Sequence, residues 1–141
     1  MEIIHKALHN EMLASKNLRM AVYIRGRKNA MNYISAYEIS VRWYLDWISE
    51  KPNWNIVAFY EDMGVPYNVD YIQCKGICRL LEDASANKMD VVITKDERKF
   101  GRNLQQSFSV VRELNKRGIG VFFVNLDIYI SEYNGEIFTP G

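Results

Sequence analysis

Residues 89–94 read MDVVIT, a short and nearly continuous apolar run that lies between two stretches of helical periodicity. A run of this length without alternation is typical of a strand buried on both faces, as strands of parallel sheets are. Apolar side chains recur at helical spacing before it, from Ile77 to Ala84, and after it, from Leu104 to Leu114. Because parallel strands need a crossover between them, this arrangement predicts an α/β fold.

The same alternation continues along most of the chain. Strands are predicted over residues 19–25, 54–62, 89–94 and 120–125, and helices over 34–50, from Ile77 to near Asn87, and from Leu104 to just before Gly118. We therefore expect a mostly parallel central sheet of four to five strands with helices on both faces. Residues 2–17 are expected to form a short amphipathic helix, so that 1–18 is an N-terminal extension and 19–141 is the main domain.

Composition limits the function classes. The 141 residues carry a formal net charge of +1 and are 48% hydrophobic and 25% charged, which fits one globular domain. This balance excludes a bulk polycation, so nucleic-acid binding would need a local basic patch. The sequence has no apolar run of membrane-spanning length and no signal-peptide pattern, so we expect a cytoplasmic protein with no membrane partner.

Basic side chains gather where two of the four predicted strands end. In folds of this type, ligands bind beyond the carboxyl ends of the strands, so the two clusters are expected to meet. They predict a site for an anion, and phosphate is the obvious candidate. The alternative is that these charges are solvated and pair with acidic neighbours such as Asp62 and Asp96. The clusters are Arg25, Arg27 and Lys28 after the first strand, and Lys95, Arg98, Lys99 and Arg102 after the third.

Four segments carry a resemblance to a known family. In chain order they are VYIRGRK, YEDMGVPY, ITKDERKFGRN and VRELNKRGIGV. Their order and approximate spacing resemble the catalytic domain of serine site-specific recombinases, the resolvase/invertase family, in the form found in large serine recombinases. The first family motif is Tyr-x-Arg-x-Ser-Thr and the second is Asp-x-Gly-x-Ser-Gly. The resemblance covers about residues 19–138 and implies the fold of that catalytic domain.

The resemblance also implies a chemistry, in which a serine attacks a DNA phosphodiester and arginines neutralise the phosphate. The position of that serine is occupied here by Arg27, and the threonine after it by Lys28. Arginine has no nucleophilic oxygen, so it cannot replace the serine. Arg25 and Arg102 keep the family's phosphate-binding positions, whereas Lys99 replaces an arginine. We therefore expect a degenerate domain, a pseudoenzyme inactive in strand exchange, from a mobile element or prophage.

The expected partner is the DNA backbone, bound weakly and without sequence preference, with Arg27, Lys28, Lys95 and Arg98 as further contacts. Family members continue into a long dimer helix and DNA-recognition domains, whereas this sequence ends at Gly141. A homodimer, or a heterodimer with an active serine recombinase, is also expected. Two alternatives stay open: an active recombinase that uses another nucleophile or a partner in trans, and a protein-interaction module that acts as an inhibitor.

No cofactor is expected. His5 and His9 are four residues apart, as are Cys74 and Cys78, and the four side chains together would be able to ligate zinc. The two pairs are far apart in sequence and lack zinc-finger spacing, so no metal is predicted. Cys74 and Cys78 are interpreted as two reduced thiols on one helix face.

Overall fold

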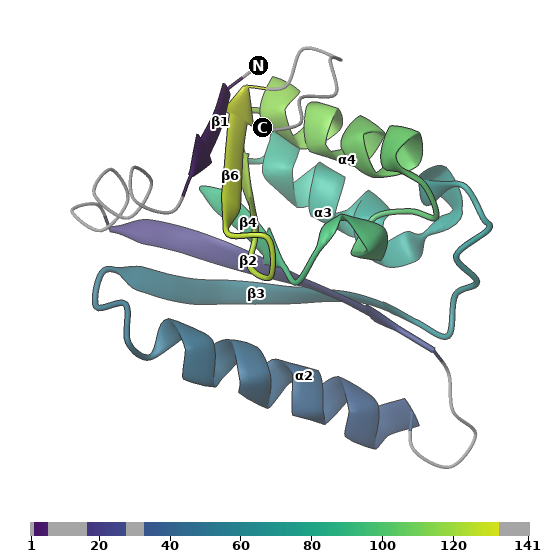
Figure 1. The fold of residues 1–141 in the computed structure, drawn as a ribbon, viewed down its shortest axis with the longest axis horizontal. Coiled ribbons are helices and arrows are strands. Elements are labelled where there is room, and N and C mark those ends of the chain that lie inside the picture. Colours follow the sequence, from purple (N-terminus) through teal and green to yellow (C-terminus); the bar gives the residue numbers. More distant parts are fainter. Residues whose placement is uncertain (1, 6–16, 28–32, 133–141) are drawn as a thin grey trace.

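The computed structural model describes residues 2–5, 17–27 and 33–132, which contain one six-stranded sheet with helices on both faces (Figure 1). The strands are β1 (Glu2–His5), β2 (Leu18–Gly26), β3 (Trp54–Met63), β4 (Val91–Thr94), β5 (Gly120–Phe123) and β6 (Ile128–Glu132). The helices are α2 (Tyr33–Ile48), α3 (Lys75–Ser85) and α4 (Leu104–Lys116), with short 3-10 turns η1 (Tyr71–Gln73) and η2 (Glu97–Lys99).

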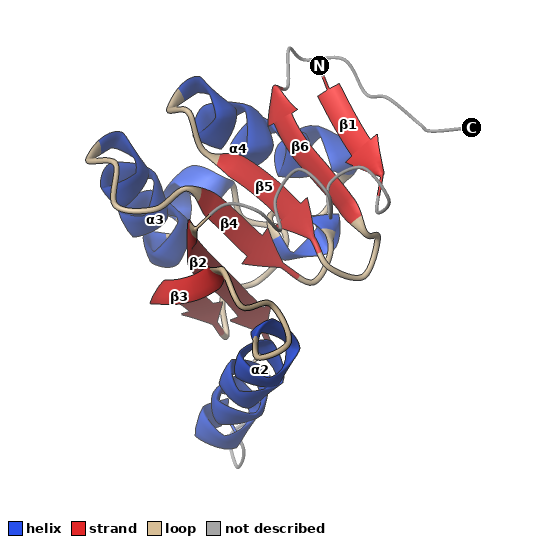
Figure 2. Ribbon diagram, turned by 90° about the vertical axis from the view of Figure 1, so that its left-hand side faces the viewer, coloured by secondary structure: helices blue, strands red, loops and turns tan. Residues whose placement is uncertain are grey.

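The strand order is β1-β6-β5-β4-β2-β3, and the four strands from β5 to β3 are parallel to one another. α2 connects β2 to β3, whereas α3 and α4 connect strands that step in the opposite direction along the sheet. Connections between parallel strands through a helix are almost always right-handed. Since the chain steps one way along the sheet through α2 and the opposite way through α3 and α4, α2 lies on one face of the sheet and α3 and α4 lie on the other. Figure 2 shows this separation of the helices. The carboxyl ends of the parallel strands consequently meet at one edge of the sheet.

The core lies on both faces of the sheet, and β2 runs through its middle. Ala21 and Tyr23 pack with side chains of α3 and α4, whereas Met20, Val22 and Ile24 pack on the α2 side. All five are buried, as the strand's position between β3 and β4 requires. A central strand buried on both faces has no polar alternation, which is why continuous apolar runs predicted these strands.

The predicted α/β class, the mostly parallel sheet and the helices on both faces are confirmed. The sheet has six strands in the described part of the chain, more than the four to five expected. The additional strands are β1 and β6, which pair with each other and extend the β5 edge antiparallel. β6 follows a tight turn in which Asp127 has a φ of 57°, a left-handed conformation that aspartate tolerates.

The expected helix over residues 2–17 is wrong for residues 2–5, which form β1. This segment is a strand because it pairs with β6, which is distant in sequence. The spacing of apolar residues within the segment gives no information about that pairing. The rest of that predicted helix, residues 6–16, lies outside the described residues. Among the helices that the structure describes, none combines the length and apolarity needed to cross a membrane.

Candidate functional site

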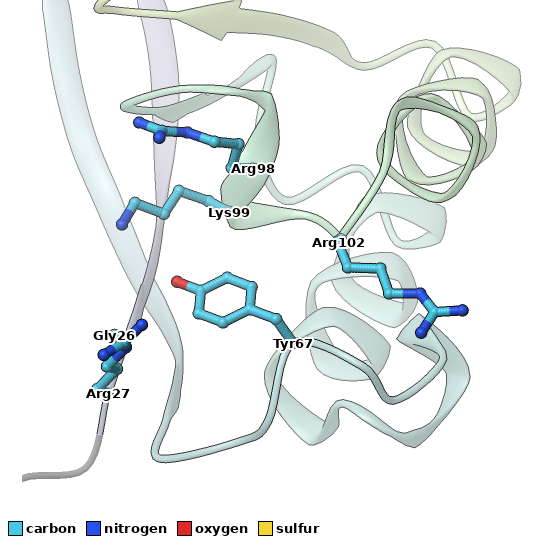
Figure 3. Close-up of a pocket in the computed structure, with 7 residues that line it drawn as sticks. Gly26, Arg27, Tyr67, Arg98, Lys99 and Arg102 are labelled. Atoms are coloured by element: carbon cyan, nitrogen blue, oxygen red, sulfur yellow. The ribbon is translucent and has the colours of Figure 1, made fainter.

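A cavity of about 470 Å³ opens at the carboxyl edge of the sheet, where the two predicted basic clusters approach each other (Figure 3). One wall comes from the end of β2, and the opposite wall comes from η2 and the residues that precede α4. The loop after β3 contributes an aromatic ring. The lining residues are Gly26, Arg27, Tyr67, Arg98, Lys99, Gly101 and Arg102.

The segment that carries three of the cations is held against α4. The Ser107 hydroxyl donates a 2.6 Å hydrogen bond to the Glu97 carbonyl, and the Asn103 side chain caps α4 by accepting from the N–H of Gln106 at 2.9 Å. Gly101 is required at this junction, because a Cβ there would lie 2.8 Å from the Gln106 Cβ. These contacts orient Arg98, Lys99 and Arg102 beside the cavity.

The cations of the cavity are not equivalent. The Arg98 guanidinium is bound to Asp96, with its Nη2 3.0 Å from one carboxylate oxygen and its Nε 3.2 Å from the other. Burial works against ionisation of Asp96, but these bonds from Arg98 outweigh it and lower the pKa of the carboxyl. Within the described residues, Arg27, Lys99 and Arg102 form no ion pair. The free positive charge therefore comes mainly from these three side chains.

Arg25 has a different environment from the cavity cations. Its side chain is buried beneath the loop after β3, where its Nη2 donates a 2.8 Å hydrogen bond to the Pro66 carbonyl and its guanidinium lies 4.4 Å from the Tyr67 ring centroid. Its Nε and Nη1 are buried and lack a hydrogen-bond partner within the described residues. Arg25 does not line this cavity, but it lines a second, smaller space of about 20 Å³ together with Lys99, which lines both.

Lys95 also lies away from the cavity. It lines a separate space of about 20 Å³ next to Ser40 and Tyr44 of α2, and its ammonium is 4.7 Å from the Trp43 ring centroid. Burial lowers the pKa of Lys95, and the nearby Lys99 charge lowers it further. Of the predicted site residues, Arg27, Arg98, Lys99 and Arg102 line the larger cavity. Arg25 and Lys95 line the smaller space instead, and Lys99 lines both. Lys28 lies outside the described residues.

Tyr67 is the lining residue that sequence reasoning missed. Its hydroxyl points across the cavity toward Lys99 and the end of β2 (Figure 3). It carries the only hydroxyl among the described residues that line this cavity. Burial raises the pKa of Tyr67, although the charges of Arg25, Arg27 and Arg98 oppose the increase. The available signal was the loop motif itself, which ends in glycine in the family pattern and in Tyr67 here.

The cysteines and histidines do not form a metal centre in the described part of the chain, where no group of three or more His, Cys, Asp or Glu side chains is arranged to hold an ion. Cys74 and Cys78 are free thiols, and Cys74 is buried at the start of α3. Burial raises the pKa of Cys74, which keeps the thiol protonated. His5 is in β1, and His9 lies outside the described residues.

Comparison with known proteins gives a family and a fold. The family model described as "Resolvase, N terminal domain" matches residues 22–140. A comparison with curated proteins gives no match. Among solved structures, the chain is similar to the C-terminal catalytic domain of ISC1926 TnpA, an IS607-like serine recombinase. That match has a TM-score of 0.63 at 17% identity and covers 75% of this chain and 67% of the other.

Two further structures have the same fold. The N-terminal catalytic domain of TP901-1 integrase matches with a TM-score of 0.62 at 19% identity, covering 83% of this chain and 85% of that one. A resolvase family site-specific recombinase from Streptococcus pneumoniae matches with a TM-score of 0.62 at 20% identity, covering 83% of this chain and 78% of that one. At these identities the structural likeness supports the fold, and the family model supports the family.

Proposed function

Because this chain belongs to the family of the resolvase N-terminal domain, the serine recombinase catalytic domain, we propose that its cavity binds a DNA backbone phosphate without serine-mediated strand exchange. One observation carries the proposal: Arg27 lines the cavity at the position where the resemblance expects the serine nucleophile. A guanidinium attracts and orients a phosphate but has no oxygen with which to attack it. The same substitution thus supports binding and opposes cleavage.

The charge distribution supports phosphate as the ligand. Arg27, Lys99 and Arg102 line one cavity and make no ion pair within the described chain, so an entering anion does not have to displace a carboxylate from them. Such contacts act on the backbone of any sequence, and their strength falls as salt concentration rises. The proposed binding is therefore non-specific and most evident at low ionic strength.

The family also implies dimerisation. We include in the proposal that this domain pairs with a second copy of itself or with an active serine recombinase. In a mixed pair, a subunit that holds a phosphate without attacking it would lower the yield of a reaction that needs both nucleophiles. This form of modulation follows from the substitution at Arg27.

Incubation with supercoiled plasmid tests the proposal directly. The protein is expected to retard DNA in a gel at low salt and to leave the plasmid uncut after denaturation with detergent. An active serine recombinase with its own target plasmid serves as the positive control. A covalent protein–DNA adduct that disappears when one hydroxyl residue is replaced would contradict the predicted inactivity. Absence of any retardation at low salt would contradict the proposed phosphate binding.

A further inference from the structure

We propose that the cavity accepts one nucleotide of a single-stranded DNA. Tyr67 would be the stacking surface for its base, and Arg27, Lys99 and Arg102 would contact its phosphate. This inference rests on the proposed phosphate binding and adds the class of nucleic acid. It is carried by the position of Tyr67, which combines an aromatic ring and a set of cations in one cavity.

The size and lining of the cavity suit a nucleotide. Its volume of about 470 Å³ lies in the range of about 300–1,000 Å³ that is usual for pockets binding small molecules. A backbone phosphate alone would leave most of this space unfilled. Proteins that bind single strands without sequence preference combine positive charge along the backbone with aromatic rings on which bases stack. The present cavity contains both features.

The Tyr67 ring is held in place before any ligand enters. The Arg25 guanidinium lies 4.4 Å from the ring centroid, and Arg25 is in turn bonded to the carbonyl of Pro66, the residue before Tyr67. Arg25 is only 3% exposed, so this support comes from the protein interior. A fixed ring loses less conformational entropy on binding than a mobile one. Arg25 therefore supports the ring, while the other cations face the ligand.

The phenol adds no negative charge beside the phosphate. Burial raises the pKa of Tyr67, so its hydroxyl stays protonated at neutral pH and is able to donate a hydrogen bond. In Figure 3 this hydroxyl points toward the Lys99 side chain and the strand end that carries Arg27. The polar end of the ring thus lies near the cations, and a base would stack on the ring face that the Arg25 guanidinium does not cover.

Single strands are favoured over duplexes for an energetic reason. A base in duplex DNA is already paired and stacked, so it reaches an aromatic side chain in a pocket only after being extruded, which costs unpairing and unstacking free energy. A base in a single strand avoids most of that cost. A duplex would therefore present only its phosphates to Arg27, Lys99 and Arg102.

Fluorescence anisotropy with three labelled ligands tests this inference: a single strand of about 12 nucleotides, the same strand in a duplex, and an abasic strand of equal length. We expect the single strand to bind at least about fivefold more tightly than the other two, the lower limit for stacking one base. Tyr67→Leu is expected to remove this difference, whereas Tyr67→Phe, which keeps the ring, is expected to retain it. Thermal melts of both variants confirm that they are folded.

The outcomes separate the two proposals. Equal affinity for all three ligands, still weakened by Arg27→Gln, would contradict the single-strand inference and leave the phosphate proposal intact. Tighter binding of every ligand by Tyr67→Leu would also contradict it, because the ring would then be blocking the cavity. A lack of binding to any of the three ligands at low salt would instead contradict the phosphate binding on which the inference depends.

Discussion

The Tyr23 hydroxyl donates a 2.7 Å hydrogen bond to the carboxylate of Asp62, and both residues are buried. The same carboxylate accepts the backbone N–H groups of Gly76 at 2.8 Å and of Ile77 at 3.1 Å. Asp62 therefore joins β2, β3 and the beginning of α3. It occupies a motif position by the family resemblance, and the structure gives that position a role in holding the fold together.

Replacing Asp62 is expected to reduce stability strongly. Asp62→Ala would leave three buried donors without an acceptor, and we expect the free energy of unfolding to fall by about 3 kcal/mol. Tyr23→Phe removes one donor and leaves the two backbone donors paired, so we expect a loss of about 1 kcal/mol. Urea denaturation followed by circular dichroism measures both. A larger loss for Tyr23→Phe than for Asp62→Ala would contradict this view of the network.

Gly76 is expected to be intolerant of a side chain. A Cβ at this position would collide with the Glu61 carbonyl oxygen and would lie 2.8 Å from an Asp62 carboxylate oxygen, so α3 would have to move away from β3. We expect Gly76→Ala to lower the free energy of unfolding by about 1–3 kcal/mol, the usual cost of overpacking. Lys75→Ala, on the exposed neighbouring residue, is the control and should change stability little. Equal stability of the two variants in thermal melts would refute the expectation.

Acid is expected to lower the free energy of unfolding through the contact between Arg19, at the beginning of β2, and Asp90, just before β4. Arg19 bonds to Asp90 through its backbone N–H at 2.8 Å and its Nη2 at 3.0 Å, and the side-chain bond lowers the pKa of Asp90 in the folded state. The stabilisation is complete above the ordinary aspartate pKa of about 3.9 and is lost as pH falls through the lower folded-state pKa. In unfolding measurements from pH 6 to pH 2, roughly, Asp90→Asn should reduce this pH dependence.

The exposed Glu38→Gln on α2 is the control for Asp90→Asn. It removes one carboxylate without disturbing the contact between Arg19 and Asp90. Identical pH dependence in the wild type and in Asp90→Asn would show that this contact contributes nothing to acid stability.

Cavity cations are expected to differ in their effect on DNA binding. Arg27→Gln and Lys99→Gln should each weaken binding and reduce the slope of log K against log salt by about 1, since each removes one phosphate contact. Arg98→Gln should have a smaller effect, because Asp96 already binds that guanidinium. Arg42→Gln, on the exposed face of α2, is the control. Equal slopes for all four variants would argue against this cavity as the contact.

Sequence patterns predicted the parallel part of this fold well. Strands buried on both faces and helices with one apolar face leave periodic signals in the sequence, so the segments around 89–94 and 104–117 were found within a few residues. The two antiparallel strands were not found. β6 is a short strand that pairs with β5 and β1, and the pairing partner of β1 within the described chain is β6, which is distant from it in sequence. Local periodicity contains no information about such a partner.

Part of the candidate site was likewise predictable from the sequence, and part of it was not. The order of chemical groups along the chain indicated an anion site and placed Arg27 where a nucleophile was expected, because those statements depend only on which residues follow which strands. Only the tertiary structure showed that Arg25 is buried under Tyr67, that Lys95 lies beside Trp43, and that a tyrosine enters the cavity. The direction of a side chain at a strand end depends on the loops and helices that pack around it, and these come from distant parts of the chain.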